Sequence, residues 1–92
     1  MEPVRIRIRD REYVVRGEEG EEDIQRIADY VNNKIEEIQR SAEGLSERKT
    51  AILAALNIAS EYFRVLKERE ALLTKIRQRT ESLIGNIDST LG

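Results

Sequence analysis

The 92-residue sequence contains no cysteine and no histidine. Without cysteine there is no disulfide framework and no thiolate metal site, and without histidine the commonest general base and zinc ligand are missing. There is also no glycine-rich phosphate loop and no obvious pair of catalytic carboxylates. We therefore expect a protein that is not an enzyme, with no catalytic residue, metal, cofactor or small-molecule substrate.

Long apolar segments are absent as well. No stretch has 18 consecutive apolar residues, and the N-terminus has no charged-then-apolar signal. We therefore expect a soluble, cytoplasmic protein that does not insert into a membrane. Aromatic residues make up only 4% of the chain, whereas charged residues make up 37%. High charge together with regular helical spacing is typical of a coiled coil.

The charge is distributed in three blocks. Residues 1–17 carry five bases and three acids, residues 18–47 three bases and ten acids, and residues 48–92 eight bases and five acids. The net charge of −2 favours neither nucleic acid nor an anionic membrane as a bulk partner. The acids of residues 18–23 lack the spacing of an EF-hand calcium loop and suit the start of a helix, where they complement the helix dipole.

The N-terminal residues predict a β-hairpin. Val4 to Arg9 alternates apolar and basic residues, and Glu12 to Arg16 is also β-prone. A turn at Asp10-Arg11 places Ile8 opposite Tyr13 and Ile6 opposite Val15, with Arg9 opposite Glu12 and Arg5 opposite Arg16. Arginine is a poor residue for a type I′ turn, and an isolated hairpin is marginal in water.

Two helices are predicted after the hairpin. Apolar residues spaced by three and four predict an amphipathic helix, and they are Ile24, Ile27, Val31, Ile35, Ile38 and Ala42. Gly44 is the expected left-handed cap residue of this helix, and Ser46 is the expected N-cap of the next. The second helix is predicted from Ser46 to about Ile84, a length of roughly 60 Å.

The second helix has an apolar stripe that a chain of this length cannot cover by itself. Its spacing changes near Leu66–Arg69, which we interpret as a stammer or as the junction between a head and a stalk. The residues expected to mediate oligomerisation are Leu56, Ala59, Phe63, Leu66, Leu73, Ile76, Leu83 and Ile87. The predicted fold is thus an oligomeric α+β protein, with a head of hairpin and first helix (residues 1–45) and a long C-terminal coiled-coil helix (residues 46–92).

The arginines of the hairpin are its sharpest electrostatic feature, and they are Arg5, Arg7, Arg9, Arg11 and Arg16. They suit a docking face for an acidic partner, or equally a positive strand face that discourages aggregation. Nucleic acid is a weaker alternative, because only Tyr13 supplies an interleaved aromatic ring.

Three segments in this order resemble the ZapA family of bacterial cell-division proteins. They are Pro3-Val4-x-Ile6-x-Ile8 in the hairpin, Ala28-Asp29-Tyr30-Val31-Asn32 in the first helix and Ala54-Ala55-Leu56-Asn57-Ile58-Ala59 early in the second. The resemblance covers roughly residues 3–70. It implies a non-enzymatic protein that dimerises through head and stalk, and that forms tetramers through antiparallel stalks. It also implies that the heads bind and cross-link filaments of FtsZ at the mid-cell division site.

The resemblance also indicates which residues contact the filament. Arg11 matches a basic position at the hairpin tip, and Arg9 belongs to the same basic face. Arg40, Arg48 and Lys49 lie in the corresponding region around the end of the first helix. Within the motif Ala54, Ala55, Leu56 and Asn57, we favour a structural role for Asn57 over partner contact. The family often has glycine where this chain has Asp10, which leaves the geometry of the turn open.

Two alternatives remain at this point. The chain can be a generic coiled-coil adaptor with a different protein partner, or the basic hairpin can bind nucleic acid. The first alternative is tested by sedimentation with FtsZ filaments, and the second by the salt dependence of DNA binding.

Overall fold

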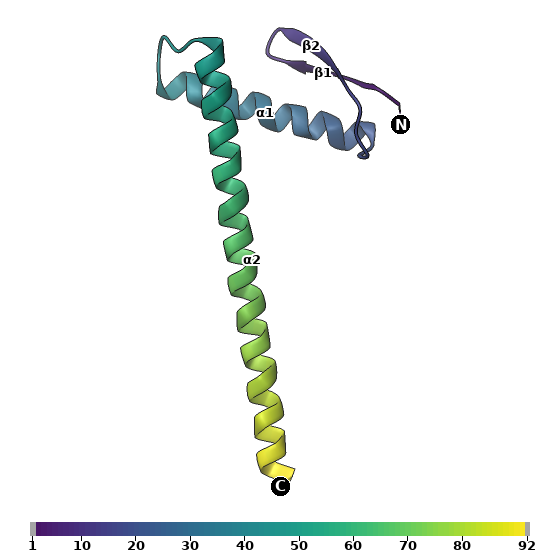
Figure 1. Cartoon of the computed structure of the whole chain (residues 1–92), viewed down its shortest axis with the longest axis vertical. Helices are drawn as coiled ribbons and strands as arrows, with labels where there is room; N and C mark the ends of the chain where they lie inside the picture. The colour runs from purple at the N-terminus through teal and green to yellow at the C-terminus, as the bar shows by residue number, and fades with distance from the viewer. Residues whose placement is uncertain (1, 92) are drawn as a thin grey trace. The chain divides into compact units, whose positions relative to one another are not determined.

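The fold is a β-hairpin followed by two helices. A computed structural model of the chain describes the backbone of residues 2–91 and the side chains of residues 2–84. The elements, in order, are β1 (Val4–Ile8), β2 (Arg11–Val15), α1 (Glu21–Ser41) and α2 (Glu47–Leu91) (Figure 1). Met1–Ile58 forms one compact unit and Ala59–Gly92 a second. The expected α+β fold class, with its order of elements, is confirmed.

The register of the hairpin differs by two residues from the one expected. The strands pair antiparallel, with Val4 opposite Val15, Ile6 opposite Tyr13 and Ile8 opposite Arg11. The two-residue turn is therefore Arg9-Asp10, and the predicted turn at Asp10-Arg11 is wrong. Because side chains alternate along a strand, a shift of two residues keeps every side chain on its predicted face. The facing pairs change, and Arg7 rather than Arg9 lies opposite Glu12.

Asn32 of α1 explains why the turn forms at Arg9-Asp10. Its side-chain Nδ2 donates to the carbonyl oxygen of Arg7, and its Oδ1 accepts from the backbone N–H of Arg9, both at 2.8 Å. Arg9 has a φ of 59°, which only glycine adopts without strain. These two hydrogen bonds offset the strain and fix the position of the turn.

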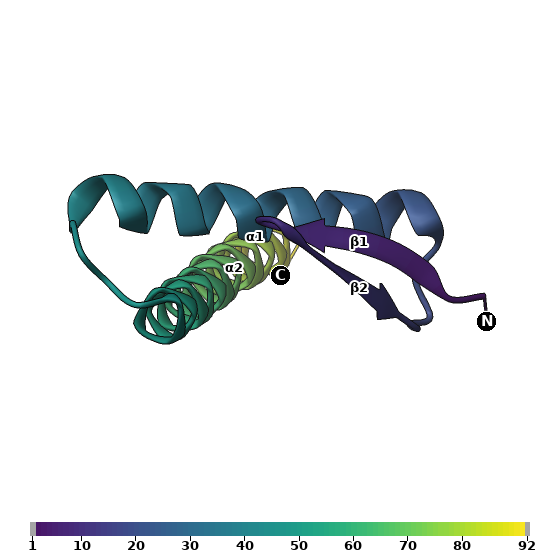
Figure 2. The ribbon, with the colours of Figure 1, turned by 90° about the horizontal axis from the view of Figure 1, so that it is seen from above.

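The core of the first unit is formed by residues of β1, α1 and the start of α2. Its buried apolar side chains are Val4, Ile24, Ala28, Ile35 and Ala54. α1 lies against β1, with β2 on the far side of β1 (Figure 2). The helix was expected to bury Ile27, but Ile27 is 53% exposed and Ala28 is buried in its place. A small side chain at position 28 allows the strand to approach α1 closely, so the buried stripe is turned by one position.

The link between the helices confirms one expected cap and corrects another. The hydroxyl of Ser46 accepts a hydrogen bond from the backbone N–H of Lys49 at 3.1 Å, as an N-cap does. The cap of α1 is Ala42, whose extended backbone donates to the carbonyl of Ile38, and not Gly44. Gly44 is left-handed, with a φ of 75°, but it lies in the turn that follows the cap.

The contacts of Asn32 predict a specific loss of stability. Asn32→Ala removes two hydrogen bonds that fix the strained turn, so we expect the free energy of unfolding to fall by about 1–3 kcal/mol. The adjacent Asn33 is exposed and is the matched control, and Asn33→Ala should change stability much less. Urea unfolding at one fixed protein concentration measures both, and equal losses would contradict the role of Asn32.

Candidate partner-binding site

The Arg9-Asp10 turn is anchored to both helices by the side chain of Arg9. The guanidinium of Arg9 lies 3.9 Å from Oε1 of Glu47, in the first turn of α2. In the orientation that pairs both groups, the amide oxygen of Gln39 on α1 also accepts hydrogen bonds from this guanidinium. The side chain of Arg9 is only 36% exposed. Arg9 therefore positions the turn and presents little free surface to a partner.

Arg11 is presented differently. Its side chain is 68% exposed, and among the described residues its one ion pair is with Oε2 of Glu47 at 3.7 Å. An exposed ion pair of this length contributes about 0–1 kcal/mol, so a partner's carboxylate can replace Glu47 at low cost. Of the two arginines expected at this site, Arg11 is the one whose charge is available.

A small cavity lies beneath the turn. It has a volume of about 130 Å³ and is lined by residues of both strands, of α1 and of the first turn of α2. Thr50 and Ile35 form part of its wall, and Thr50 is almost fully buried. The hydroxyl of Thr50 donates to the carbonyl of Ser46 at 2.9 Å, so its polar group is satisfied. The cavity is thus a packing space under the turn.

The other basic residues expected at the site lie at the two ends of the helix link. Arg40 is in the last turn of α1, and Arg48 and Lys49 directly follow Glu47 in the first turn of α2. All three are exposed. The structure brings Arg48 and Lys49 into the same helical turn as the residue that pairs with Arg11. Arg40 makes no ion pair or hydrogen bond with the turn among the described residues.

The arginine row is partly compensated by acids. Arg7 pairs with Glu12 at 3.2 Å, while Arg9 and Arg11 share Glu47. A nucleic-acid surface uses unpaired cations that displace counterions from phosphates. The hairpin therefore has less free positive charge than its sequence indicates, and only Arg5 and Arg16 of the row have no ion pair in the described part of the chain.

Sequence reasoning missed the residues that hold the tip in place. The sequence marks Glu47 only as an acid directly after the expected N-cap Ser46, and Asn32 only as part of the family resemblance. Gln25, which donates to the carbonyl of Arg5 at 2.8 Å, was not identified at all. Gln25, Asn32 and Gln39 are spaced by seven residues, which places them on one face of a helix. That polar stripe next to the apolar one was the signal available in the sequence.

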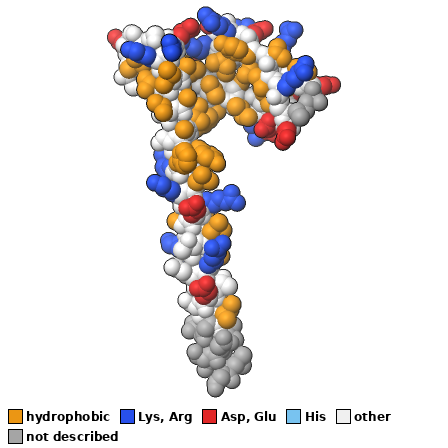
Figure 3. Space-filling model, in the orientation of Figure 1, with side chains coloured by type: hydrophobic (Ala, Val, Ile, Leu, Met, Phe, Trp, Pro, Cys, Tyr) orange, Lys and Arg blue, Asp and Glu red, His pale blue; other side chains and the backbone are white. Residues whose placement is uncertain are grey.

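The expected oligomerisation residues of the first part of α2 expose apolar surface in the single chain. Leu56 is 62% and Phe63 61% exposed, Ala59 is exposed and Leu66 is half-buried. Figure 3 shows hydrophobic side chains on the surface of both units. Within the motif, Ala54 is buried, whereas Ala55 and Asn57 are exposed. The structural role expected for Asn57 stays a prediction.

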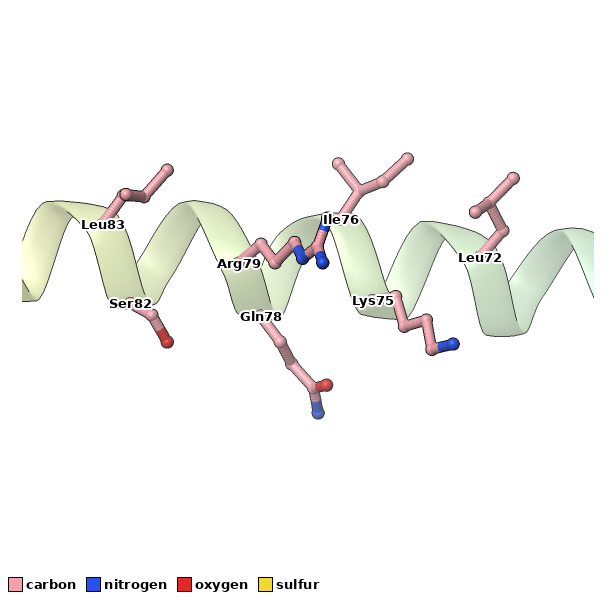
Figure 4. Close-up of a pocket in the computed structure, with 7 residues that line it drawn as sticks. All are labelled: Leu72, Lys75, Ile76, Gln78, Arg79, Ser82 and Leu83. Carbon is pink, nitrogen blue, oxygen red and sulfur yellow. The ribbon is translucent and has the colours of Figure 1, made fainter.

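The second unit has a narrow apolar stripe along one side of α2. Leu72, Ile76 and Leu83 point to the same side of the helix, and Gln78 points away from it (Figure 4). An open groove runs along this part of the helix, and every residue that lines it is exposed. Leu73, also expected on the stripe, is 44% exposed. The expected contribution of Ile87 lies outside the residues whose side chains the structure describes.

Two other kinds of site are absent from the described part of the chain. Among the described residues, no group of three or more acidic side chains is arranged to hold a metal ion. No helix in the described part of the chain is long and apolar enough to cross a membrane.

Comparison with known proteins shows the family to which the chain belongs. Residues 4–87 match the family model described as cell division protein ZapA. A cell division protein ZapA from Geobacillus thermodenitrificans is 33% identical over 75 residues, which cover 82% of each chain. Another, from Shouchella clausii, is 35% identical over 65 residues, which cover 71% of this chain and 83% of the relative.

A solved structure agrees with these sequence relatives. It is a ZapA mutant dimer from Geobacillus stearothermophilus, with 30% identity and a TM-score of 0.68, and the match covers 83% of this chain and 88% of that one. The resemblance noted in the hairpin, the first helix and the Ala54–Ala59 motif is therefore confirmed over most of the sequence. The chain is a member of the ZapA family of cell-division proteins.

Proposed function

We propose that this protein is a non-enzymatic division factor that binds FtsZ filaments and cross-links them into bundles, promoting assembly of the division ring. The observation that supports this most strongly is the match to the ZapA family over residues 4–87. The protein would act in the cytoplasm at mid-cell. Its active form would be a homodimer and homotetramer built through the long helix. The dimeric relative and the exposed apolar residues of α2 support self-association.

The division of labour we propose follows the two parts of the chain. The head, residues 1–45, would contact the filament through Arg11, with Arg9 holding the turn and with Arg40, Arg48 and Lys49 as further basic contacts. The long helix, residues 46–92, would join the heads into one body through Leu56, Ala59, Phe63, Leu66, Leu73, Ile76, Leu83 and Ile87. Cross-linking then arises from multivalency, because one bound head raises the effective concentration of the others.

The first test separates binding from bundling. Ile76→Lys places a charge on the apolar stripe of the second unit, where an unpaired buried charge costs roughly 3 kcal/mol or more. We expect the dissociation constant of the tetramer to rise by about 100-fold or more. FtsZ filaments should still bind the variant in sedimentation but should no longer form bundles in light scattering.

Gln78→Lys is the matched control, because Gln78 points away from the stripe (Figure 4). This variant should assemble and bundle filaments as the unchanged chain does. A normal tetramer in Ile76→Lys would show that the stripe does not mediate assembly. Normal bundling by a variant that cannot form tetramers would contradict the proposed cross-linking mechanism.

The second test addresses the hairpin tip. Arg11→Glu reverses an exposed charge beside Glu47, so it removes the attraction for an acidic partner and leaves α2 unchanged. We expect a normal assembly state but binding to FtsZ filaments at least about tenfold weaker at low salt. Co-sedimentation with polymerised FtsZ measures the affinity, and light scattering measures the assembly state.

Arg26→Glu is the control for the same change of charge. Arg26 is exposed on α1 and pairs only weakly with Glu22, at 3.9 Å, outside the candidate site. It should bind filaments normally. Unchanged binding by Arg11→Glu would exclude the tip and direct attention to Arg40, Arg48 and Lys49. No binding by the unchanged chain would favour a coiled-coil adaptor with another partner.

A further inference from the structure

The two edges of the hairpin are in different environments. The carbonyls of Arg5 and Arg7 on the outer edge of β1 accept hydrogen bonds from Gln25 and Asn32, both at 2.8 Å. The N–H of Arg9 continues the row by donating to Asn32. α1 therefore closes the edge of β1 with polar side chains.

The outer edge of β2 has no such cover. Ile8 and Arg11 flank the two-residue turn and form a hydrogen-bonded pair, so the alternation of an antiparallel ladder turns the backbone groups of Glu12 and Val14 away from β1. Neither backbone makes a hydrogen bond outside the hairpin in the part of the chain that the structure describes. α1 contacts β1 and not β2, and Val14 is 63% exposed.

We propose that this edge of β2 pairs antiparallel with β2 of a second copy of the chain, with Val14 opposite Val14 of that copy. The two hairpins would then form one four-stranded sheet, and the strand pairing would be a second contact between copies in addition to α2. The inference rests on the self-association proposed above, and it names a contact that the apolar residues of α2 do not predict.

The charges of β2 select one register. Outward-facing backbone groups occur at every second residue, so a symmetric pair can be centred on Glu12, on Tyr13 or on Val14. Centring on Glu12 places two glutamates directly opposite each other, which is destabilising. Centring on Tyr13 places Glu12 opposite Val14, and it brings Arg16 opposite Asp10 only in the turn, where β2 has ended.

Centring on Val14 satisfies both faces of the sheet. Glu12 lies opposite Arg16 of the second copy, twice by symmetry, so each glutamate has Arg7 on one side and the new arginine on the other. On the other face Tyr13 lies opposite Val15, which covers a ring that is 47% exposed in the single chain. Charge complementarity and apolar burial therefore favour the same register.

The sequence of β2 lacks several of the protections of an edge strand, although it is short and keeps the charges of Arg11 and Glu12. Arg11–Val15 contains no proline and no lysine, and its pairing with β1 has no bulge. A two-stranded sheet is marginal in water, and adding a third and fourth strand is a general way to stabilise it. A second copy is the occupant that supplies an arginine opposite Glu12 and an apolar residue opposite Tyr13 and Val14.

Cysteine cross-linking tests the pairing without background, because the natural chain has no cysteine. Directly opposite residues of a hydrogen-bonded pair have Cα atoms about 5.5 Å apart, within the range of a disulfide. We expect the full-length Val14→Cys variant to form covalent dimers under mild oxidation at least about tenfold faster than Glu12→Cys. In the proposed register, two copies of residue 12 lie roughly 13 Å apart along the strands.

Further variants separate the possible outcomes. Faster cross-linking of Tyr13→Cys than of Val14→Cys would overturn the register. Slow cross-linking of all three variants, with dimers still seen by light scattering, would overturn the strand pairing and leave the proposed self-association intact. A monomer would overturn both.

Charge reversal in the Val14→Cys background gives an independent readout of the same contact. Arg16→Glu should slow cross-linking several-fold, because it places Glu12 opposite a second acid. Adding Glu12→Arg together with Arg7→Glu, which keeps opposite charges at positions 7 and 12, should restore much of the rate. If this triple change slowed cross-linking as much as Arg16→Glu alone, the ion pairs between copies would be refuted.

Discussion

The shortage of buried apolar surface within one chain is the constraint on which the rest of this structure depends. Among residues 2–84, five apolar side chains are buried, all in the first unit, while fifteen large apolar side chains are exposed. Burial contributes roughly 25 cal/mol per Å² of apolar surface. Because only a few side chains are buried, they stabilise the domain only weakly. The fold therefore combines a small core with long apolar stripes that are available to further copies.

Polar side chains attach the elements of the first unit to one another, a role that apolar packing has in a protein with a larger core. α1 meets β1 through hydrogen bonds from Gln25 and Asn32 to backbone groups, and α2 reaches the turn through Glu47. Such contacts are directional, so they fix the register and the tip more exactly than apolar packing does. The candidate site is thus built on the same contacts that attach the hairpin, and its geometry depends on residues from three elements.

The helices and the existence of the hairpin could be predicted from the spacing of apolar residues alone. Apolar residues every three or four positions indicate a helix, and apolar residues at every second position indicate a strand. The register could not, since it is decided by Asn32, which lies 23 residues from Arg9 in the sequence. The burial of Ala28 instead of Ile27 depends on how closely α1 approaches β1, and the spacing of apolar residues carries no information on that distance. At the site, the predicted hairpin placed Arg11 at the tip but within the turn and not directly after it. The anchoring of Arg9 required the contacts of Glu47 and Gln39.

The left-handed backbone at Arg9 has a consequence for the order in which the molecule folds. The first residue of the turn, Arg9, has a strained positive φ, so the turn is a poor starting point for a hairpin. The turn is stabilised when α1 supplies the hydrogen bonds of Asn32. The hairpin therefore depends on a helix residue that lies 23 positions later in the chain. We therefore expect the helices of the first unit to form before the hairpin, because the contact between Asn32 and the turn is non-local.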